Sequence, residues 1–255
     1  FNADGFNLCI VKSGNDLPQS KIDFITKVAG TFAEYGRIFA ADNIRELPDL
    51  LNGLPDRYII YPDFTIDREY QYGSTLVIQQ SFQTTGLIPY LSVNNESKYW
   101  ALHFLAEHCR NMIPIAVHLK RVSDNLEESN ADLILWSKFF TRIYEERYPV
   151  KFILTGPDPL IPEINTAPNV VRSQNYNSTI SYDLGLIQHS AAFMGMASGP
   201  SIMAVFNRNP YLIFKHPDHH RMEMEKELGG KDRYPFALNN QKLVCDRQSP
   251  EKLWS

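Results

Sequence analysis

Residues 191–214 contain the feature that most restricts the fold. Two apolar runs of strand length lie at residues 192–196 and 211–214, separated by a turn of small residues at 197–201 and a short helical stretch to Phe206. Pro200 fits the first turn of that helix, because this position can spare its N–H. Strands joined through a helix run parallel to each other, so this stretch predicts a βαβ unit of an α/β sheet.

The same alternation of strand-like and helix-like segments runs along the rest of the chain, as in open parallel sheets covered by helices. We expect strands at residues 8–11, 37–41, 58–61, 76–80, 113–119, 151–155 and 169–172, and helices at 19–35, 44–54, 96–110, 132–147, 181–190 and 221–228. Gly36 is expected to stop the first helix. Trp100, Leu102, Phe104 and Leu105 are expected to form the buried face of the helix at 96–110.

The length of 255 residues allows one large or two small domains. We expect an N-terminal half over residues 1–95, whose completeness the sequence leaves open, and a C-terminal half over residues 96–255. Within these halves we find no internal repeat and no low-complexity tract.

The charge of the chain argues against partners that bind through a general positive field. The formal net charge is −4, with 25 basic and 29 acidic residues, so we expect no nucleic-acid partner and only local binding of anions. No apolar run approaches the length of a membrane span, so we expect no transmembrane segment. Cys9, Cys109 and Cys245 lie far apart without metal-type spacing, which favours a reducing, cytoplasmic location, with the cytoplasmic face of a membrane as an alternative. The sequence leaves the oligomeric state open.

Two strand ends carry residues suited to an anionic ligand. The turn of Ser198, Gly199, Pro200 and Ser201 offers the free amides of a helix start and two hydroxyls, a combination that suits a phosphate. An ordinary βα junction is the alternative for this turn.

The strand at residues 113–119 ends in His118, followed by Lys120 and Arg121, two cations that could grip a diphosphate. A solvated basic strand end is the alternative. After the strand at 151–155 come Thr155 and Gly156, where glycine permits close approach of a ligand, although a simple tight turn explains it as well.

These features resemble the C-terminal half of two-domain glycosyltransferases with the GT-B architecture. The run His-Leu-Lys-Arg at residues 118–121 is similar to the H-x-R-R motif of α-1,6-fucosyltransferase-like enzymes, in which the first Arg binds the donor diphosphate. In this chain, Lys120 occupies the position of that Arg. The stretch at residues 193–204 resembles the strand-turn-helix that cradles the donor phosphate in heptosyltransferases and other bacterial surface-carbohydrate transferases. Those families usually carry an acidic residue where this chain has Ala197. The resemblance covers residues 113–215.

The resemblance implies two Rossmann-like halves with parallel sheets that face a central cleft. It implies a glycosyltransferase that moves a sugar from a nucleotide-diphosphate donor, bound by the C-terminal half, to a glycan or lipid-linked acceptor on the N-terminal half. The implied donor-binding residues are His118, Lys120, Arg121, Thr155, Gly156, Tyr182, Asp183, Ser198, Gly199, Pro200 and Ser201. Since no D-x-D motif occurs and two cations can replace a metal ion, we expect no metal and no cofactor beyond the donor substrate.

An inverting transferase also needs a base to deprotonate the acceptor hydroxyl. Asp16 and Asp63, which follow the first strand and the strand at 58–61, are the candidates, and a role as turn formers is the alternative. His216, His219 and His220 belong to the segment Lys-His-Pro-Asp-His-His at residues 215–220, whose His and Asp side chains are of the kinds that bind metal ions. Because Pro217 breaks helical spacing, we expect a polar loop there.

Two other functions remain open at the level of sequence. Nucleotide-sugar 2-epimerases and polysaccharide pyruvyltransferases share an architecture of two Rossmann-like halves. A non-catalytic module that keeps the nucleotide-sugar pocket is the other alternative, since Lys120 and Ala197 differ from the transferase patterns.

Overall fold

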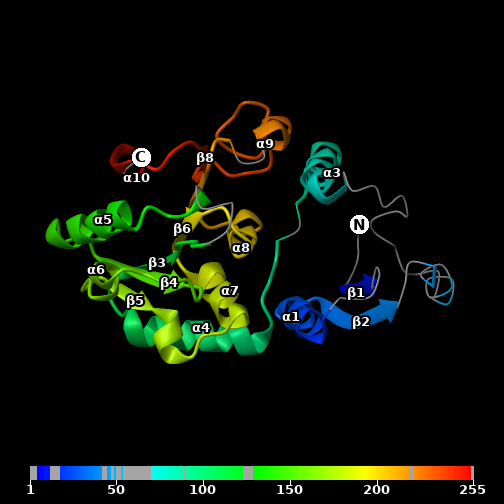
Figure 1. Ribbon diagram of the computed structural model, residues 1–255, viewed down its shortest axis with the longest axis horizontal. Helices are drawn as coiled ribbons and strands as arrows, with labels where there is room; N and C mark the ends of the chain where they lie inside the picture. The colour runs from blue at the N-terminus through cyan, green and yellow to red at the C-terminus, as the bar shows by residue number, and fades with distance from the viewer. Residues whose placement is uncertain are drawn as a thin grey trace. The chain divides into compact units, whose positions relative to one another are not determined.

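The computed structural model describes residues 5–11, 18–41, 45–46, 49, 53, 70–88, 90–122, 129–218 and 221–253 (Figure 1). The chain divides into two compact units, Phe1–Ser74 and Thr75–Ser255. The expected strand at 58–61 and most of the expected helix at 44–54 lie outside the described residues.

The first unit contains one βαβ element. Strands β1 (Phe6–Val11) and β2 (Tyr35–Ala41) pair in parallel, and helix α1 (Gln19–Ala29) connects them. Both strand predictions are confirmed, whereas the helix is shorter than expected. It ends at Ala29 because the next amides turn back in short-range hydrogen bonds, Thr31 N–H to Val28 O and Phe32 N–H to Ala29 O. Gly36, expected to stop the helix, instead lies inside β2.

The second unit is built on a six-stranded sheet in which every neighbouring pair is parallel. Its strands are β3 (Ile113–His118), β4 (Val150–Thr155), β5 (Val170–Arg172), β6 (Ala192–Met196), β7 (Tyr211–Lys215) and β8 (Gln241–Cys245). The order across the sheet is β5-β4-β3-β6-β7-β8, so the chain moves outward from β3, returns beside it at β6 and then moves outward the other way. This is the strand order of the Rossmann fold, and it confirms the α/β class.

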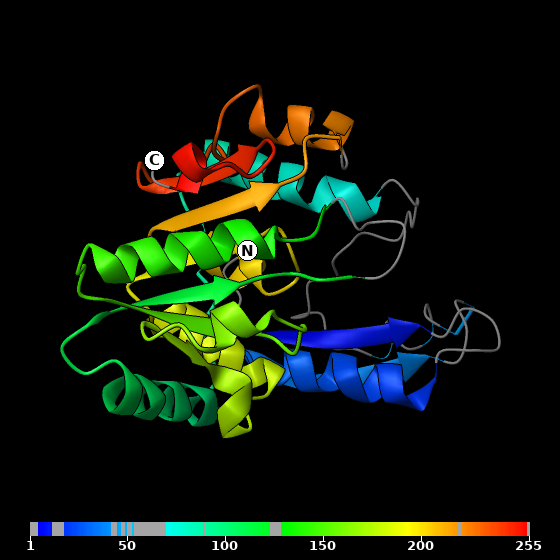
Figure 2. The same cartoon turned by 60° about the vertical axis from the view of Figure 1, so that its left-hand side comes forward.

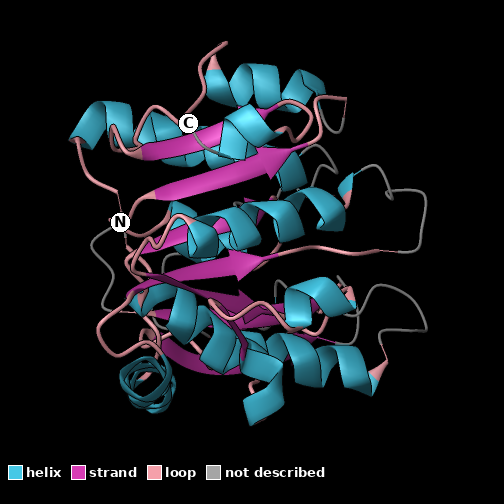
Figure 3. Cartoon of the chain, turned by 90° about the vertical axis from the view of Figure 1, so that its left-hand side faces the viewer, coloured by secondary structure: helices cyan, strands magenta, loops and turns pink. Residues whose placement is uncertain are grey.

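Helices cover both faces of this sheet, shown as magenta strands between cyan helices in Figure 3. On one face, helix α5 (Leu133–Glu145) buries Trp136 and Phe140 against strand residues such as Phe152 and Phe214. On the other face, α4 (Asn95–His108) and α7 (Ile180–His189) lie together and pack Phe104 and Leu186 against the sheet (Figure 2). Because side chains alternate along a strand, the buried runs supply both cores.

Side-chain caps begin the three long helices of these layers. Asn94 accepts a hydrogen bond from Ser97 N–H at the start of α4, and Asp132 accepts one from Leu135 N–H at the start of α5. Thr179 stands in the same position before α7. Leu102, expected on the buried face of α4, is 42% exposed, because α4 buries Ser97, Ala101 and Phe104 at helical spacing instead.

The remaining elements are short, apart from α3 (Tyr70–Thr85). They are α6 (Pro162–Asn165), a 3₁₀ helix (Ser173–Tyr176), α8 (Ser201–Val205), α9 (Arg221–Leu228) and α10 (Pro250–Leu253). The strand expected at residues 76–80 is wrong, because this stretch belongs to α3. Its Gln79 donates a buried hydrogen bond to Glu227 O, and Phe82, three residues later, meets the Phe236 ring, which is helical spacing.

These contacts of α3 place residues 75–85 with the second unit. The division between the two compact units therefore falls earlier along the chain than the expected boundary at residue 95. The functional division into acceptor and donor halves stays a prediction. Among the described helices, none combines the length and hydrophobicity that a bilayer crossing requires.

Candidate functional site

The ends of β3, β4 and β6 meet at the point where the strand order reverses. In the sheet register, His118 at the end of β3 lies beside Thr155 of β4 and Gly195 of β6. In open α/β sheets, ligands bind beyond the carboxyl ends of the strands at such a switch point. The candidate site is therefore the sheet edge formed by the carboxyl ends of β3, β4 and β6, where the residues predicted from the sequence follow the strands.

The imidazole of His118 is held in a defined orientation. The residue is 5% exposed, and its Nδ1 lies 3.2 Å from Thr155 O. A carbonyl oxygen can only accept, so Nδ1 carries the proton, and neutral His118 has its lone pair on Nε2. Nε2 faces the Oδ2 atom of Asp158 at 3.9 Å. Burial lowers the pKa of His118, an effect that the Asp158 carboxylate opposes, so we expect a neutral imidazole at pH 7.

Two glycines permit the close packing around His118. Gly156 has a φ of +91°, and a Cβ there would lie 2.7 Å from His118 Cε1. Gly195 has a φ of +147°, and a Cβ there would overlap the backbone carbonyl oxygen of His118. Only glycine suits these positions, since each combines a positive φ with missing space. We predicted that Gly156 permits the close approach of a ligand. In the structure, the group that lies close to Gly156 is the imidazole of His118.

Asp183 fixes the turn after β4 from inside the protein. One carboxylate oxygen accepts from Ser173 Oγ at 2.7 Å and Ser178 Oγ at 2.6 Å, and the other accepts from Gly156 N–H at 2.9 Å. The residue is 2% exposed, and burial raises the pKa of Asp183, although these hydrogen bonds oppose the shift. Asp183 thus orients Gly156, whereas its implied role in donor binding stays a prediction.

Thr155 and Tyr182, two further residues of the implied donor-binding set, make contacts inside the protein. Thr155 Oγ1 donates to Val117 O at 3.2 Å. Tyr182 stacks on Trp100 with ring centroids 4.6 Å apart, and its hydroxyl donates to Glu96 at 2.8 Å. The side chain of Tyr182 therefore belongs to the interface between α4 and α7.

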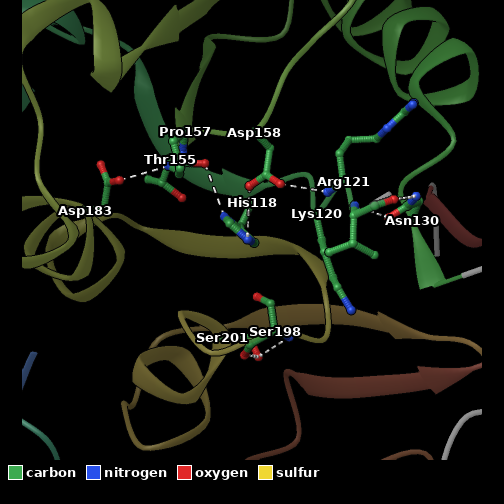
Figure 4. Close-up of polar contacts among 12 residues, drawn as sticks. His118, Lys120, Arg121, Asn130, Thr155, Pro157, Asp158, Asp183, Ser198 and Ser201 are labelled. Atoms are coloured by element: carbon green, nitrogen blue, oxygen red, sulfur yellow. Dashed lines mark hydrogen bonds and ion pairs between the residues drawn. The ribbon is translucent and has the colours of Figure 1, made fainter. Parts of the chain in front are cut away.

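Lys120 and Arg121 do not form one paired clamp. Figure 4 shows the two side chains extending in opposite directions, with the Lys120 ammonium on the side of Ser198 and Ser201. Neighbouring residues of an extended chain point to opposite sides. Lys120 Nζ donates to Ser129 Oγ at 2.9 Å, while the Arg121 side chain is exposed. The Lys120 ammonium is thus held by Ser129, and in this view it lies on the side of the turn after β6.

The turn after β6 uses most of its own amides. The N–H groups of Ser201, Ile202 and Met203 donate to the carbonyls three residues earlier, and Ser198 N–H donates to Ser201 Oγ at 3.2 Å. Pro200 has no N–H, so the expected pocket of free amides is reduced to Gly199. A Cβ added at Gly199 would meet open space, and Ser198 Oγ is buried without a hydrogen-bond partner in the part of the chain that the structure describes.

The remaining candidates lie elsewhere. Asp16 and Asp63, the expected bases, are outside the described residues, as are His219 and His220. His216 lines a cavity of about 400 Å³ at the ends of β7 and β8, together with Asp218, Arg221 and Cys245. Within the described ranges, no group of three or more His, Cys, Asp or Glu residues is arranged to hold a metal ion.

Sequence reasoning missed the residues that support the site. Asp158 accepts from Arg121 N–H at 2.9 Å, and Arg172 donates to the carbonyl oxygens of Pro157 and Asp158. Asn130 holds Val122 through two hydrogen bonds of 2.7 and 2.8 Å. The signal for Asp158 was present, because a carboxylate three residues after a strand end reaches the same sheet edge.

No protein-family model and no curated protein matches the chain. Among solved structures, the chain is similar to the E. coli heptosyltransferase WaaC with ADP-2-deoxy-2-fluoro heptose. The match covers 97% of this chain and 95% of that chain, with 11% sequence identity and a TM-score of 0.43.

Proposed function

We propose that this protein is a glycosyltransferase that binds a nucleotide-diphosphate sugar at the switch point between β3 and β6. The observation that carries the proposal is the Lys120 ammonium, held on the side of the turn at Ser198–Ser201, where Gly199 faces open space. A diphosphate needs a cation and an unobstructed backbone approach, and both occur at this edge of a Rossmann-ordered sheet.

The chemistry of sugar transfer explains why a cation belongs there. As the bond between sugar and diphosphate breaks, negative charge grows on the leaving phosphate, and a fixed positive group stabilises it. Lys120 supplies a compact charge, and the exposed Arg121 can swing to the phosphates once they are bound. We propose that these two groups replace a metal ion.

The acceptor side of the reaction needs a base, for which Asp16 and Asp63 remain the candidates of this proposal. A glycan or a lipid-linked sugar is the acceptor class that we propose. Exchange of either aspartate for asparagine should lower kcat and leave the affinity for the nucleoside diphosphate unchanged. An acceptor-independent interconversion of nucleotide sugars would instead identify an epimerase.

The first test measures the binding of UDP, GDP, CDP, ADP and dTDP by thermal shift, with and without EDTA. A ligand that binds the native state raises Tm. We expect one nucleotide to raise Tm, with EDTA making no difference. Lys120→Ala should weaken that nucleotide about ten- to hundredfold, the range of a hydrogen bond between charged groups. Lys138→Ala removes the same charge from the exposed face of α5 and serves as the control. Equal affinities of the Lys120 variant and the wild type would refute the site.

A further inference from the structure

The peptide group between Lys120 and Arg121 is held on both sides. Its carbonyl oxygen, from Lys120, accepts a hydrogen bond from Ala131 N–H at 3.0 Å. Its N–H, from Arg121, donates to Asp158 Oδ1 at 2.9 Å. Two hydrogen bonds at opposite ends of one peptide fix the orientation of its plane, and the plane sets the direction in which the Lys120 side chain leaves the backbone.

The two supports of this peptide come from different parts of the sheet edge. On one side, residues 129–131 form a continuous contact, in which Ser129 accepts from Lys120 Nζ and Asn130 binds both polar groups of the Val122 backbone. On the other side, the support is the side chain of Asp158. Removal of this one carboxylate therefore removes the link between the ends of β3 and β4 at Arg121.

Asp158 is itself firmly placed. Arg172, the last residue of β5, donates to the Asp158 carbonyl oxygen at 2.7 Å. Asp183 holds the amide of Gly156 two residues earlier. The Asp158 side chain is 20% exposed, and its second oxygen faces His118 Nε2 at 3.9 Å. Asp158 therefore links β5, through Arg172, and the turn after β4 to the segment after β3, through the Arg121 amide.

The charge of Asp158 makes its location unexpected for a phosphate site. A negative group beside a bound diphosphate opposes binding through Coulomb repulsion. Its deletion should thus tighten diphosphate binding, unless the carboxylate contributes geometry that outweighs the repulsion. Loss of the repulsion would raise the affinity for the diphosphate, whereas loss of the geometry would lower it. An experiment can therefore separate the two effects.

We propose that Asp158 is a positioning residue, which fixes the Lys120–Arg121 peptide and thereby aims the Lys120 ammonium at the donor diphosphate. The inference rests on the proposed function, since it takes Lys120 as the phosphate contact. It adds a role for a residue that touches neither phosphate nor sugar and acts through the backbone of its neighbour.

Two variants of Asp158 separate geometry from charge. Asp158→Asn keeps an oxygen that can accept from Arg121 N–H and removes the charge, whereas Asp158→Ala removes both. We expect Asp158→Ala to weaken the selected nucleoside diphosphate about tenfold in calorimetric titration, the scale of one hydrogen bond to a charged group. Asp158→Asn should bind at least as tightly as the wild type. Glu163→Ala, which removes an exposed carboxylate of α6, controls for net charge.

Equal or tighter binding by Asp158→Ala would overturn the positioning role and leave only electrostatic repulsion. An equal loss in both variants would overturn it as well, because the asparagine retains the acceptor. Circular dichroism and Tm of both variants identify any general loss of folding, and Asp158→Asn still decides the question if the alanine variant is unfolded.

A second readout needs no ligand. Hydrogen exchange of the Arg121 amide, measured by NMR, should be slow in the wild type and in Asp158→Asn and at least about tenfold faster in Asp158→Ala. The pKa of His118 should fall in both variants, since Asp158 supports the imidazolium together with Asp183, whereas Lys120 opposes it. If the wild type binds no nucleoside diphosphate, the proposed function fails, whereas unchanged exchange of the Arg121 amide in Asp158→Ala would overturn the positioning role.

Discussion

Substitution of Gly156 by alanine tests the packing at the centre of the site. The new Cβ would lie 2.7 Å from His118 Cε1 and 2.8 Å from Nδ1, in a backbone conformation with a φ of +91°. The positive φ costs an L-residue about 1–2 kcal/mol, and overpacking costs about 1–3 kcal/mol. We therefore expect Gly156→Ala to lower the free energy of unfolding by about 2–5 kcal/mol.

The two contributions can be separated with other glycines of the same unit. Gly230 has a φ of +76° with open space around its Cβ position, so Gly230→Ala should show the conformational cost alone, about 1–2 kcal/mol. Gly199 has open space and no positive φ, so Gly199→Ala should stay within about 0.5 kcal/mol of the wild type. The three variants form a series in which each step adds one physical cause.

Urea unfolding followed by tryptophan fluorescence suits this comparison. Trp100 and Trp136 lie in the described part of the second unit, so their emission reports on the unit that contains these glycines. Thermal unfolding should show the same order, with Gly156→Ala lowering Tm by roughly 4–20 °C. A cost for Gly156→Ala no larger than that for Gly230→Ala would refute the close packing of Gly156 on His118.

Two further predictions concern protons and thiols. Burial lowers the pKa values of His118 and His189, so the unfolded chain binds more protons than the folded protein at pH values below about 6.5, and stability should fall as the pH drops through this range and level off above it. Urea unfolding between pH 5 and pH 7.5 should show a smaller decline for His118→Gln than for the wild type, and an identical decline would contradict the burial of this imidazole. Burial raises the pKa of both Cys109, to about 11, and Cys245, but only Cys245 is exposed, so Ellman's reagent at pH 8 should label Cys245 before Cys109, and Cys109 only on unfolding. Equal labelling rates of these two thiols in the native protein would contradict this prediction.

The sheet of the second unit was predictable because buried parallel strands are continuous apolar runs. The expected segments at residues 113–119, 151–155, 192–196 and 211–214 each match a strand to within a residue or so. β8 escaped prediction because it lies at the sheet edge and reads Gln-Lys-Leu-Val-Cys, with polar residues at its start. The apolar residues 76–78 led to the wrong prediction of a strand at residues 76–80, since β-branched residues also occur in helices when tertiary contacts at helical spacing hold them.

The meeting of these strand ends at one sheet edge was predictable, but the contacts of the side chains there were not. Sequence order placed His118, Lys120, Thr155 and Ser198 at one sheet edge, because parallel strands end together. Sequence order did not reveal that Lys120 and Arg121 diverge, although the alternation of side chains in extended backbone could have suggested it. It also could not identify Asp183 as an internal acceptor, since that depends on the hydroxyls of Ser173 and Ser178, which precede α7, donating to its carboxylate.

The turn after β6 shows why a small-residue motif does not by itself define an anion site. Free amides at a helix start require that the first N–H groups lack partners, which holds when the helix bonds each N–H to the carbonyl four residues earlier. Here the turn tightens to bonds across three residues, and the N–H groups of Ser201, Ile202 and Met203 are used. Affinity for a diphosphate at this turn must then come mainly from side-chain charge. For this reason the loss on replacing Lys120 should exceed the loss on replacing Ser201, whose hydroxyl donates to Ser198 O.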